Sequence, residues 1–105
     1  MSEFKFIRWD KSAPPDEEET EANVRKEGYE PIRWTDPAGS NYPRHRHEVD
    51  ELIWVLQGQI LFNLSGQNYL MNPGDRMYLP KGISHSANVS DSSAALYFVG
   101  QKRGS

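Results

Sequence analysis

The sequence predicts an all-β, antiparallel fold, and three observations carry that prediction. From Tyr29 onward the chain divides into short apolar segments of strand length, separated by turn-forming residues. No segment after Tyr29 has the apolar spacing of an amphipathic helix. The chain has 105 residues, 36% of them hydrophobic, which suits one domain with a single modest core. Many short strands without helices indicate a sandwich or a barrel.

The N-terminal region, residues 1–28, differs in composition from the rest. Residues 4–9 carry large apolar side chains and predict a short strand. Pro14 and Pro15 then interrupt any regular element. We therefore divide the chain into residues 1–28, an N-terminal strand followed by an acidic flexible segment, and residues 29–105, the β domain.

Two structures are open for the acidic segment. Residues 16–21 hold five carboxylates in six positions, and such a run is most simply a solvated linker. A helix over 16–27 is the alternative, because acidic residues lead it and basic residues close it. Against the helix, Ala22 and Val24 are its only apolar residues, which leaves it without a face to bury.

The β domain is predicted to contain eight strands. Glycine and proline mark the turns between them, and Gly58 and Gly74 stand where a positive φ is required. The predicted strands are 29–35, 42–47, 51–57, 59–64, 67–71, 75–79, 84–90 and 94–100.

The strand 51–57 is apolar on both faces. Alternation places Glu51, Ile53 and Val55 on one face, and Leu52, Trp54 and Leu56 on the other. If the first face lines the interior, the second is an apolar stripe that something must cover. The candidates are the N-terminal strand, with its large apolar side chains Phe4, Phe6 and Trp9, or a second subunit.

The histidines form the most specific pattern in the chain. They and one glutamate fall in two motifs, Gly39-x5-His45-x-His47-x3-Glu51-x6-Gly58 and Gly74-x5-Pro80-x-Gly82-x2-His85. His45 and His47 stand two apart on an extended segment, so both imidazoles project to one side. Glu51 follows after a tight turn, and only folding can bring His85 to the same place. Three neutral imidazoles and a carboxylate suit a divalent Fe, Mn, Ni, Cu or Zn ion.

This two-part motif resembles that of the cupin superfamily, and the resemblance extends over residues 39–85. It implies a jelly-roll barrel with a short N-terminal extension, a metal held by His45, His47, Glu51 and His85, a small-molecule ligand or substrate, and a homodimer in which Trp54 is buried. Members often carry asparagine where this chain has Val89. Asp50, beside the same turn, is the next carboxylate ligand if Glu51 points away.

Three functions follow from the resemblance. The first is a metal-dependent enzyme of the oxygenase or oxidase type acting on a small molecule, with isomerases and decarboxylases also open. The second is a non-catalytic sensor-type module that binds a small molecule or a metal. The third is a structural site, as a tetrahedral zinc with four protein ligands would be. No catalytic residue is assigned, but histidines that ligate a metal cannot act as free bases, which leaves metal-bound water, Glu51 or a tyrosine as the possible acid or base.

Several other polar side chains have two interpretations each. Arg76, on a strand beside the second motif, either binds an anionic substrate or lies at the surface. Gln57 either enters the pocket or meets solvent at a strand end. Arg44, Arg46 and Glu48 alternate away from the histidines and are expected on the outer face. The aromatic residues are expected partly inside and partly outside: Tyr42, Phe62, Tyr69, Tyr78, Tyr97 and Phe98.

Composition excludes several classes of function. The net charge of −3 and the pI of about 5.6 lack the basic footprint of nucleic-acid or anionic-membrane binding. No apolar run approaches the roughly 20 residues of a membrane span, and no secretory signal is evident, so the cytoplasm is the expected location. The chain has no cysteine, which excludes disulfides and thiolate metal ligands.

Overall fold

The computed structural model of the chain describes residues 3–104; positions 1, 2 and 105, at the ends of the two predicted regions, lie outside that range. The described residues form nine strands and one helix, and each predicted strand is confirmed to within two residues at either end. The elements are β1 (Lys5–Ile7), α1 (Glu17–Lys26), β2 (Tyr29–Asp36), β3 (Asn41–His45), β4 (Glu51–Gln57), β5 (Ile60–Leu64), β6 (Gln67–Met71), β7 (Arg76–Leu79), β8 (His85–Val89) and β9 (Ala95–Lys102).

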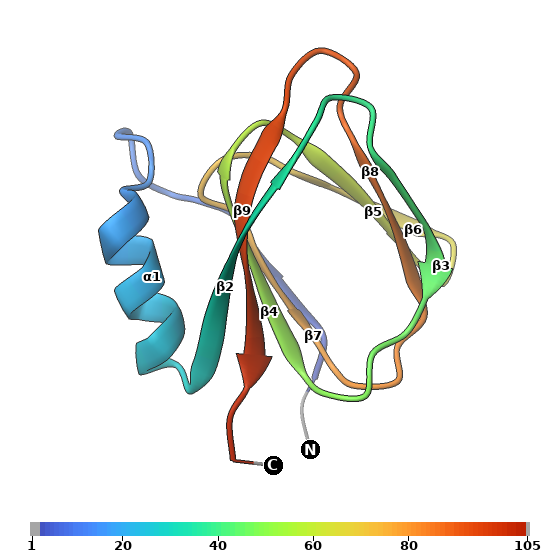
Figure 1. Cartoon of the computed structure of the whole chain (residues 1–105), viewed down its shortest axis with the longest axis horizontal. Coiled ribbons are helices and arrows are strands. Elements are labelled where there is room, and N and C mark those ends of the chain that lie inside the picture. Colours follow the sequence, from blue (N-terminus) through green and yellow to red (C-terminus); the bar gives the residue numbers. More distant parts are fainter. Residues whose placement is uncertain (1–2, 105) are drawn as a thin grey trace.

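The strands form two antiparallel sheets that face each other (Figure 1). One sheet has the order β1-β7-β4-β9-β2 and the other β3-β8-β5-β6. Apart from β5 and β6, neighbouring strands in each sheet are far apart in the chain, and this order confirms the predicted jelly roll. The sheets do not close into a continuous hydrogen-bonded barrel, so the edge strands β2 and β3 border an opening between them.

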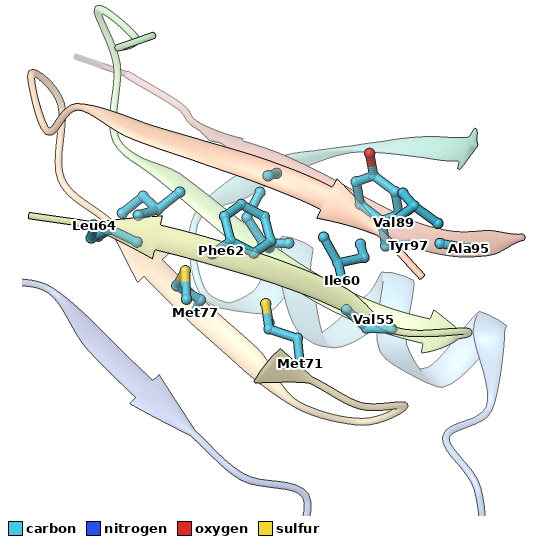
Figure 2. Packing of buried hydrophobic residues seen from close by; sticks show 12 residues of the cluster. Val55, Ile60, Phe62, Leu64, Met71, Met77, Val89, Ala95 and Tyr97 are labelled. Atoms are coloured by element: carbon cyan, nitrogen blue, oxygen red, sulfur yellow. The ribbon is translucent and has the colours of Figure 1, made fainter. Parts of the chain in front are cut away.

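The main core fills the space between the sheets. Strand β4 contributes Ile53 and Val55, which are 4% and 0% exposed, as the predicted alternation requires. Figure 2 shows this cluster from close by, with Val55, Phe62 and Tyr97 among its labelled members. Burying aliphatic and aromatic side chains on this scale is the principal source of stability in a small β domain.

The acidic segment folds as helix α1, which corrects its interpretation as a flexible linker. Asp16 caps the helix by accepting a 2.9 Å hydrogen bond from the backbone N–H of Glu19. Thr20 and Val24, one turn apart, are buried against the sheet. The helix needs only this narrow stripe, because the sheet supplies the large apolar side chains that complete the contact.

Helix α1 covers the outer apolar face of β4. The second buried cluster joins Val24 to Leu52, Trp54 and Leu56, with Trp9 packed against its edge. The predicted burial of Trp54 is therefore met within a single chain, where the residue is 4% exposed. This face of the sheet gives no argument for a second subunit, and part of its cover comes from α1, a segment whose simplest sequence interpretation was a solvated linker.

Close packing of the helix depends on a glycine in β9. A Cβ atom on Gly100 would lie 2.8 Å from Cγ1 of Val24 and 2.9 Å from Cβ of Tyr29. Only the absent side chain lets the helix approach the sheet this closely. Within residues 3–104 no helix is long and apolar enough to cross a membrane.

Candidate metal centre

The three histidines come together at the wall of a cavity between the two sheets. One ligating nitrogen from each of His45, His47 and His85 can be chosen so that all lie within 4.8 Å of one another. His45 and His85 face each other across the β3–β8 ladder. His47 lies just beyond the end of β3, yet its Nε2 is 3.1 Å from Nε2 of His45. The predicted convergence of the histidines is therefore what the structure shows.

Backbone carbonyls orient two of the imidazoles. Nδ1 of His45 lies 2.7 Å from the carbonyl oxygen of Pro43, and Nδ1 of His85 lies 3.1 Å from that of Ile83. A carbonyl only accepts, so each Nδ1 carries the proton and each Nε2 keeps its lone pair. Metal-ligating histidines ordinarily make this kind of hydrogen bond through the ring nitrogen that does not bind the metal. The donor set fits a divalent transition metal on that ground.

Burial favours the neutral form that a metal requires at His47 and His85. It lowers the pKa of His85 below its ordinary value, an effect partly opposed by the contact with the Ile83 carbonyl. It also lowers the pKa of His47, with the neighbouring His45 adding to the effect. Neutral imidazoles in a low-dielectric wall are ready ligands, because no proton has to be displaced at neutral pH.

Glu51 lies beside the histidines but outside their cluster. Its Oε1 is 3.5 Å from Nε2 of His47, while the side chain is not among the ligand atoms that all approach within 4.8 Å. The residue is 3% exposed, and burial raises the pKa of its carboxyl group to about 7. Glu51 therefore sits where rotation could add it to the ligand set, and in its present position it can hold or release a proton near neutrality.

Asp50, the other predicted carboxylate, has a different role in the turn. Its Oδ1 accepts a 2.8 Å hydrogen bond from the backbone N–H of Lys81, and its carbonyl accepts one from Lys102. These bonds tie the turn before β4 to the turn before β8 and to the end of β9, so Asp50 supports the approach of Glu51 and His85.

The cavity behind the histidines is small and mostly apolar. It has a volume of about 250 Å³, and Ile53, Phe62 and Ala87 form part of its wall. Ile32 and Trp34, on β2, line it as well and are 40% and 42% exposed. The cavity thus opens beside the edge strand β2, and a small molecule could enter there to reach the histidines.

A hydrogen-bonded network occupies another part of this cavity, and the sequence interpretation did not single out its centre. Asp36, at the end of β2, is 6% exposed and accepts hydrogen bonds of 2.6 Å from both Tyr42 and Tyr97. Trp34 donates to the same carboxylate over 3.1 Å. The residue precedes a proline and resembles an ordinary turn acid. The available signal was two-residue alternation, which places Asp36 on the same face of β2 as Ile32 and Trp34.

The remaining polar candidates lie away from the cavity. Arg76 stacks on the outer face with its guanidinium 4.8 Å from the centre of the Trp54 ring, which rules against a role at the histidines. Gln57 is exposed at the end of β4, so its solvent interpretation is the correct one. Arg44 is exposed, as expected, and donates to Asn63 of β5.

The aromatic residues divide as expected between the inside and the outside of the sandwich. Tyr42, Phe62 and Tyr97 line the cavity. Tyr69 packs against the rings of Phe4 and Phe6, which β1 brings alongside β7. Phe98 belongs to the outer cluster beneath α1, and Tyr78 packs against that cluster.

Comparison with protein families agrees with this geometry. A family model described as the cupin domain matches residues 32–100. Dimethylsulfoniopropionate lyase DddQ from Ruegeria pomeroyi is 34% identical over 56 residues, which are 52% of this chain and 28% of that protein. The matched stretch is thus less than a third of the lyase.

Solved structures show the same fold. A crystal structure of the DddQ lyase from Ruegeria pomeroyi has a TM-score of 0.64 and 26% identity, covering 71% of this chain and 38% of that one. A DUF861 family protein from Thermotoga maritima has a TM-score of 0.62 and 20% identity, covering 92% and 97% of the two chains. The second likeness concerns the fold alone.

Proposed function

The chain belongs to the cupin domain family, and from that premise we propose that it is a metal-dependent enzyme acting on a small molecule. One observation carries the proposal: three histidine side chains, with a buried glutamate beside them, converge on the wall of an apolar cavity of about 250 Å³. A surface or purely structural histidine cluster has no need of such a cavity.

In this proposal His45, His47 and His85 hold a divalent transition metal through Nε2, and Glu51 is the fourth available ligand. Neutral imidazoles and one carboxylate suit Fe, Mn, Ni, Cu or Zn, and the cell's supply decides among them. When bound, such an ion supplies Lewis acidity and a template for an anionic oxygen of the substrate. The apolar wall excludes water around that oxygen and strengthens every electrostatic contact with it.

Glu51 is the proposed proton carrier. Its carboxyl group is buried, has a pKa of about 7 and stands 3.5 Å from a histidine of the cluster. A base with a pKa near neutrality is the most effective one at physiological pH. Lyase or isomerase chemistry, in which a proton leaves carbon next to a carboxylate, is therefore the first candidate. The partial likeness to a dimethylsulfoniopropionate lyase supports the same class of reaction.

Oxygen-dependent chemistry, which the sequence interpretation ranked first, is the second candidate. It rests on the same histidines, because a six-coordinate metal with three or four protein ligands keeps at least two positions open. A sensor-type module would use the same cavity without the proton carrier, so Glu51 separates the enzyme from the module.

The first experiment is elemental analysis of protein purified without chelator, side by side with His45→Ala. We expect close to one transition-metal ion per wild-type chain and a loss of about tenfold or more in the variant. Equal metal content in the two proteins would contradict the proposal.

The second experiment assigns the reaction. Protein loaded with Fe(II), Mn(II), Ni(II) or Zn(II) is offered dimethylsulfoniopropionate, with release of dimethyl sulfide measured, and separately catechols and enediols, with oxygen uptake measured. Turnover that Glu51→Gln reduces by about a hundredfold supports proton transfer. Oxygen uptake that persists in Glu51→Gln favours the oxygenase instead. Inactivity of every metal form, together with ligand-induced stabilisation, would leave the binding module.

A further inference from the structure

Gln101, near the end of β9, is a polar neighbour of Glu51 within the sheet. In the two ladders of β4, Glu51 pairs with Leu79 of β7 on one side and with Gln101 on the other. Directly opposite residues of an antiparallel pair point to the same face, with their Cβ atoms about 5 Å apart. Gln101 therefore projects into the cavity next to Glu51, and both residues line its wall.

Gln101 also stands at the opening of the cavity. Strand β9 lies between β4 and the edge strand β2, where Gln101 pairs with Glu30. The carboxylate of Glu30 accepts a 2.9 Å hydrogen bond from Arg25 of α1, so it is engaged elsewhere. Gln101 is exposed, whereas Glu51 is 3% exposed. Because the opening lies beside β2 (Figure 1), a ligand that enters there passes the amide of Gln101 on its way to Glu51.

The amide of Gln101 is available to a ligand, whereas most other hydrogen-bond donors of the cavity wall are committed. Three of them donate to the buried carboxylate of Asp36: Trp34, Tyr42 and Tyr97. Two of the histidines direct Nδ1 to backbone carbonyls. Within residues 3–104, by contrast, the side chain of Gln101 makes no hydrogen bond. Its amide is thus a donor and an acceptor that the protein itself leaves unused.

A hydroxyl group is the ligand group that suits this pair of side chains. The amide of Gln101 offers N–H donors, and the carboxylate of Glu51 offers oxygen acceptors. A hydroxyl accepts and donates at once, so its oxygen can receive a hydrogen from Gln101 while its hydrogen goes to Glu51. A methyl group in the same place would leave both side chains unpaired. In an apolar cavity that loss is costly, because no water replaces the missing partner.

We propose that Gln101 is a specificity-determining residue, which together with Glu51 holds a hydroxyl group of the ligand beside the metal. This inference rests on the proposed function, because a metal on the three histidines must anchor the ligand through its anionic oxygen. It adds one contact residue to that function and one requirement on the ligand, a hydroxyl group a few bonds away from the anchoring oxygen.

The test compares two probes that differ in one group. Protein loaded with nickel(II) is titrated calorimetrically with 3-hydroxybutanoate and with 3-methylbutanoate, in which a methyl group replaces the hydroxyl. Each probe has a carboxylate with which to reach the metal. We expect the hydroxyl probe to bind about tenfold more tightly, although the apolar wall alone favours the methyl group. Equal affinity, or tighter binding of the methyl probe, would overturn the inference.

A substitution then assigns the preference to Gln101. Gln101→Leu keeps a side chain of similar volume and removes the amide, so the hydroxyl probe should lose about tenfold in affinity. The methyl probe should stay within about twofold of its wild-type affinity, because it makes no hydrogen bond to the amide. A preference that persists in Gln101→Leu means that the hydroxyl binds another group, and it overturns the inference. Equal weakening of both probes means a merely structural role and overturns it as well.

Gln67→Leu is the matched control. Gln67 is the first residue of β6, is exposed, and is not among the described residues that line the cavity. Its substitution should therefore keep the wild-type ratio of the two affinities, and loss of the ratio in this variant would contradict the assignment to Gln101. Failure of the proposed function would look different: either nickel is not retained, or neither probe binds the loaded protein.

Discussion

His45 and His85 are cross-strand partners in the β3–β8 ladder, and the centres of their rings are 4.5 Å apart. The pairing of two strands therefore brings together side chains from the two sequence motifs. Because a one-residue slip of register would turn one ring to the opposite face, the hydrogen bonds of this ladder specify the site. The histidine cluster thus depends on the correct pairing of an edge strand.

Removing His85 should abolish stabilisation by metal. We expect wild-type protein to unfold at a higher temperature with a saturating divalent metal, by the equivalent of about 2.7 kcal/mol when the metal is at a hundred times its dissociation constant. His85→Ala should lose this gain, because the remaining ligands no longer surround the ion. Differential scanning calorimetry with and without metal measures it. Asn88→Ala, on the exposed face of the same strand, is the control and should keep the gain.

The metal-free protein should lose stability as Glu51 ionises. Burial raises the pKa of this carboxyl group from 4.5 to about 7 in the folded state. The stabilising contribution of the neutral form is complete below the unfolded value and is lost as the pH rises to about 7. Metal-free Glu51→Gln should therefore match wild type at pH 4 and exceed it at pH 8 by about 2 kcal/mol. Urea unfolding at the two pH values measures the difference. An equal difference in unfolding free energy between variant and wild type at both pH values would refute the raised pKa of Glu51.

Metal affinity should have the opposite pH dependence. Binding at the cluster needs neutral histidines, and Glu51 can join only as a carboxylate. Since burial raises the pKa of Glu51 to about 7 and lowers the pKa values of His47 and His85, Glu51 protonates before these two histidines on acidification. Zinc affinity measured with a competing chelator should fall as the pH drops below about 7. In Glu51→Gln that part of the fall should disappear.

Truncating Val24 should destabilise the protein through the contact between helix and sheet. Val24, on the face of α1 that meets the sheet, is fully buried, and truncating its side chain leaves a cavity in the cluster that contains Trp54. We expect Val24→Ala to lower the free energy of unfolding by about 2 kcal/mol. Ala22→Ser, at an exposed position of the same helix, should change it by less than about 0.5 kcal/mol. Equal effects of the two substitutions would mean that the helix does not pack as described.

Gly100 should be coupled to Val24. An added methyl group would lie 2.8 Å from Cγ1 of Val24, so Gly100→Ala should cost about 1–3 kcal/mol through overpacking. Removing the valine methyl groups makes room for it. The double variant with Val24→Ala should therefore be more stable than the sum of the two single effects predicts. Strict additivity in urea unfolding would show that the helix adjusts its position instead.

Local patterns predicted most strand positions but failed at the helix. Two-residue alternation and turn residues located the strands and showed which face of β4 points inward, since these signals lie within a few neighbouring residues. Helix α1 was left without a role because only Thr20 and Val24 enter its contact. Its stability comes largely from apolar groups on the sheet. Those groups are far away in the chain, so the helix sequence alone does not show them.

The amino-acid sequence by itself determined which side chains are available for a metal, the spacing of His45 and His47, and the two-sided burial of β4. Only the tertiary structure decided that His85 faces His45, that α1 covers Trp54, and that Asp36 gathers two phenols at one end of the cavity. The physical reason is that the first group depends on backbone geometry over a few residues. The second depends on strand pairing and packing between distant segments, whose free energy no local pattern expresses.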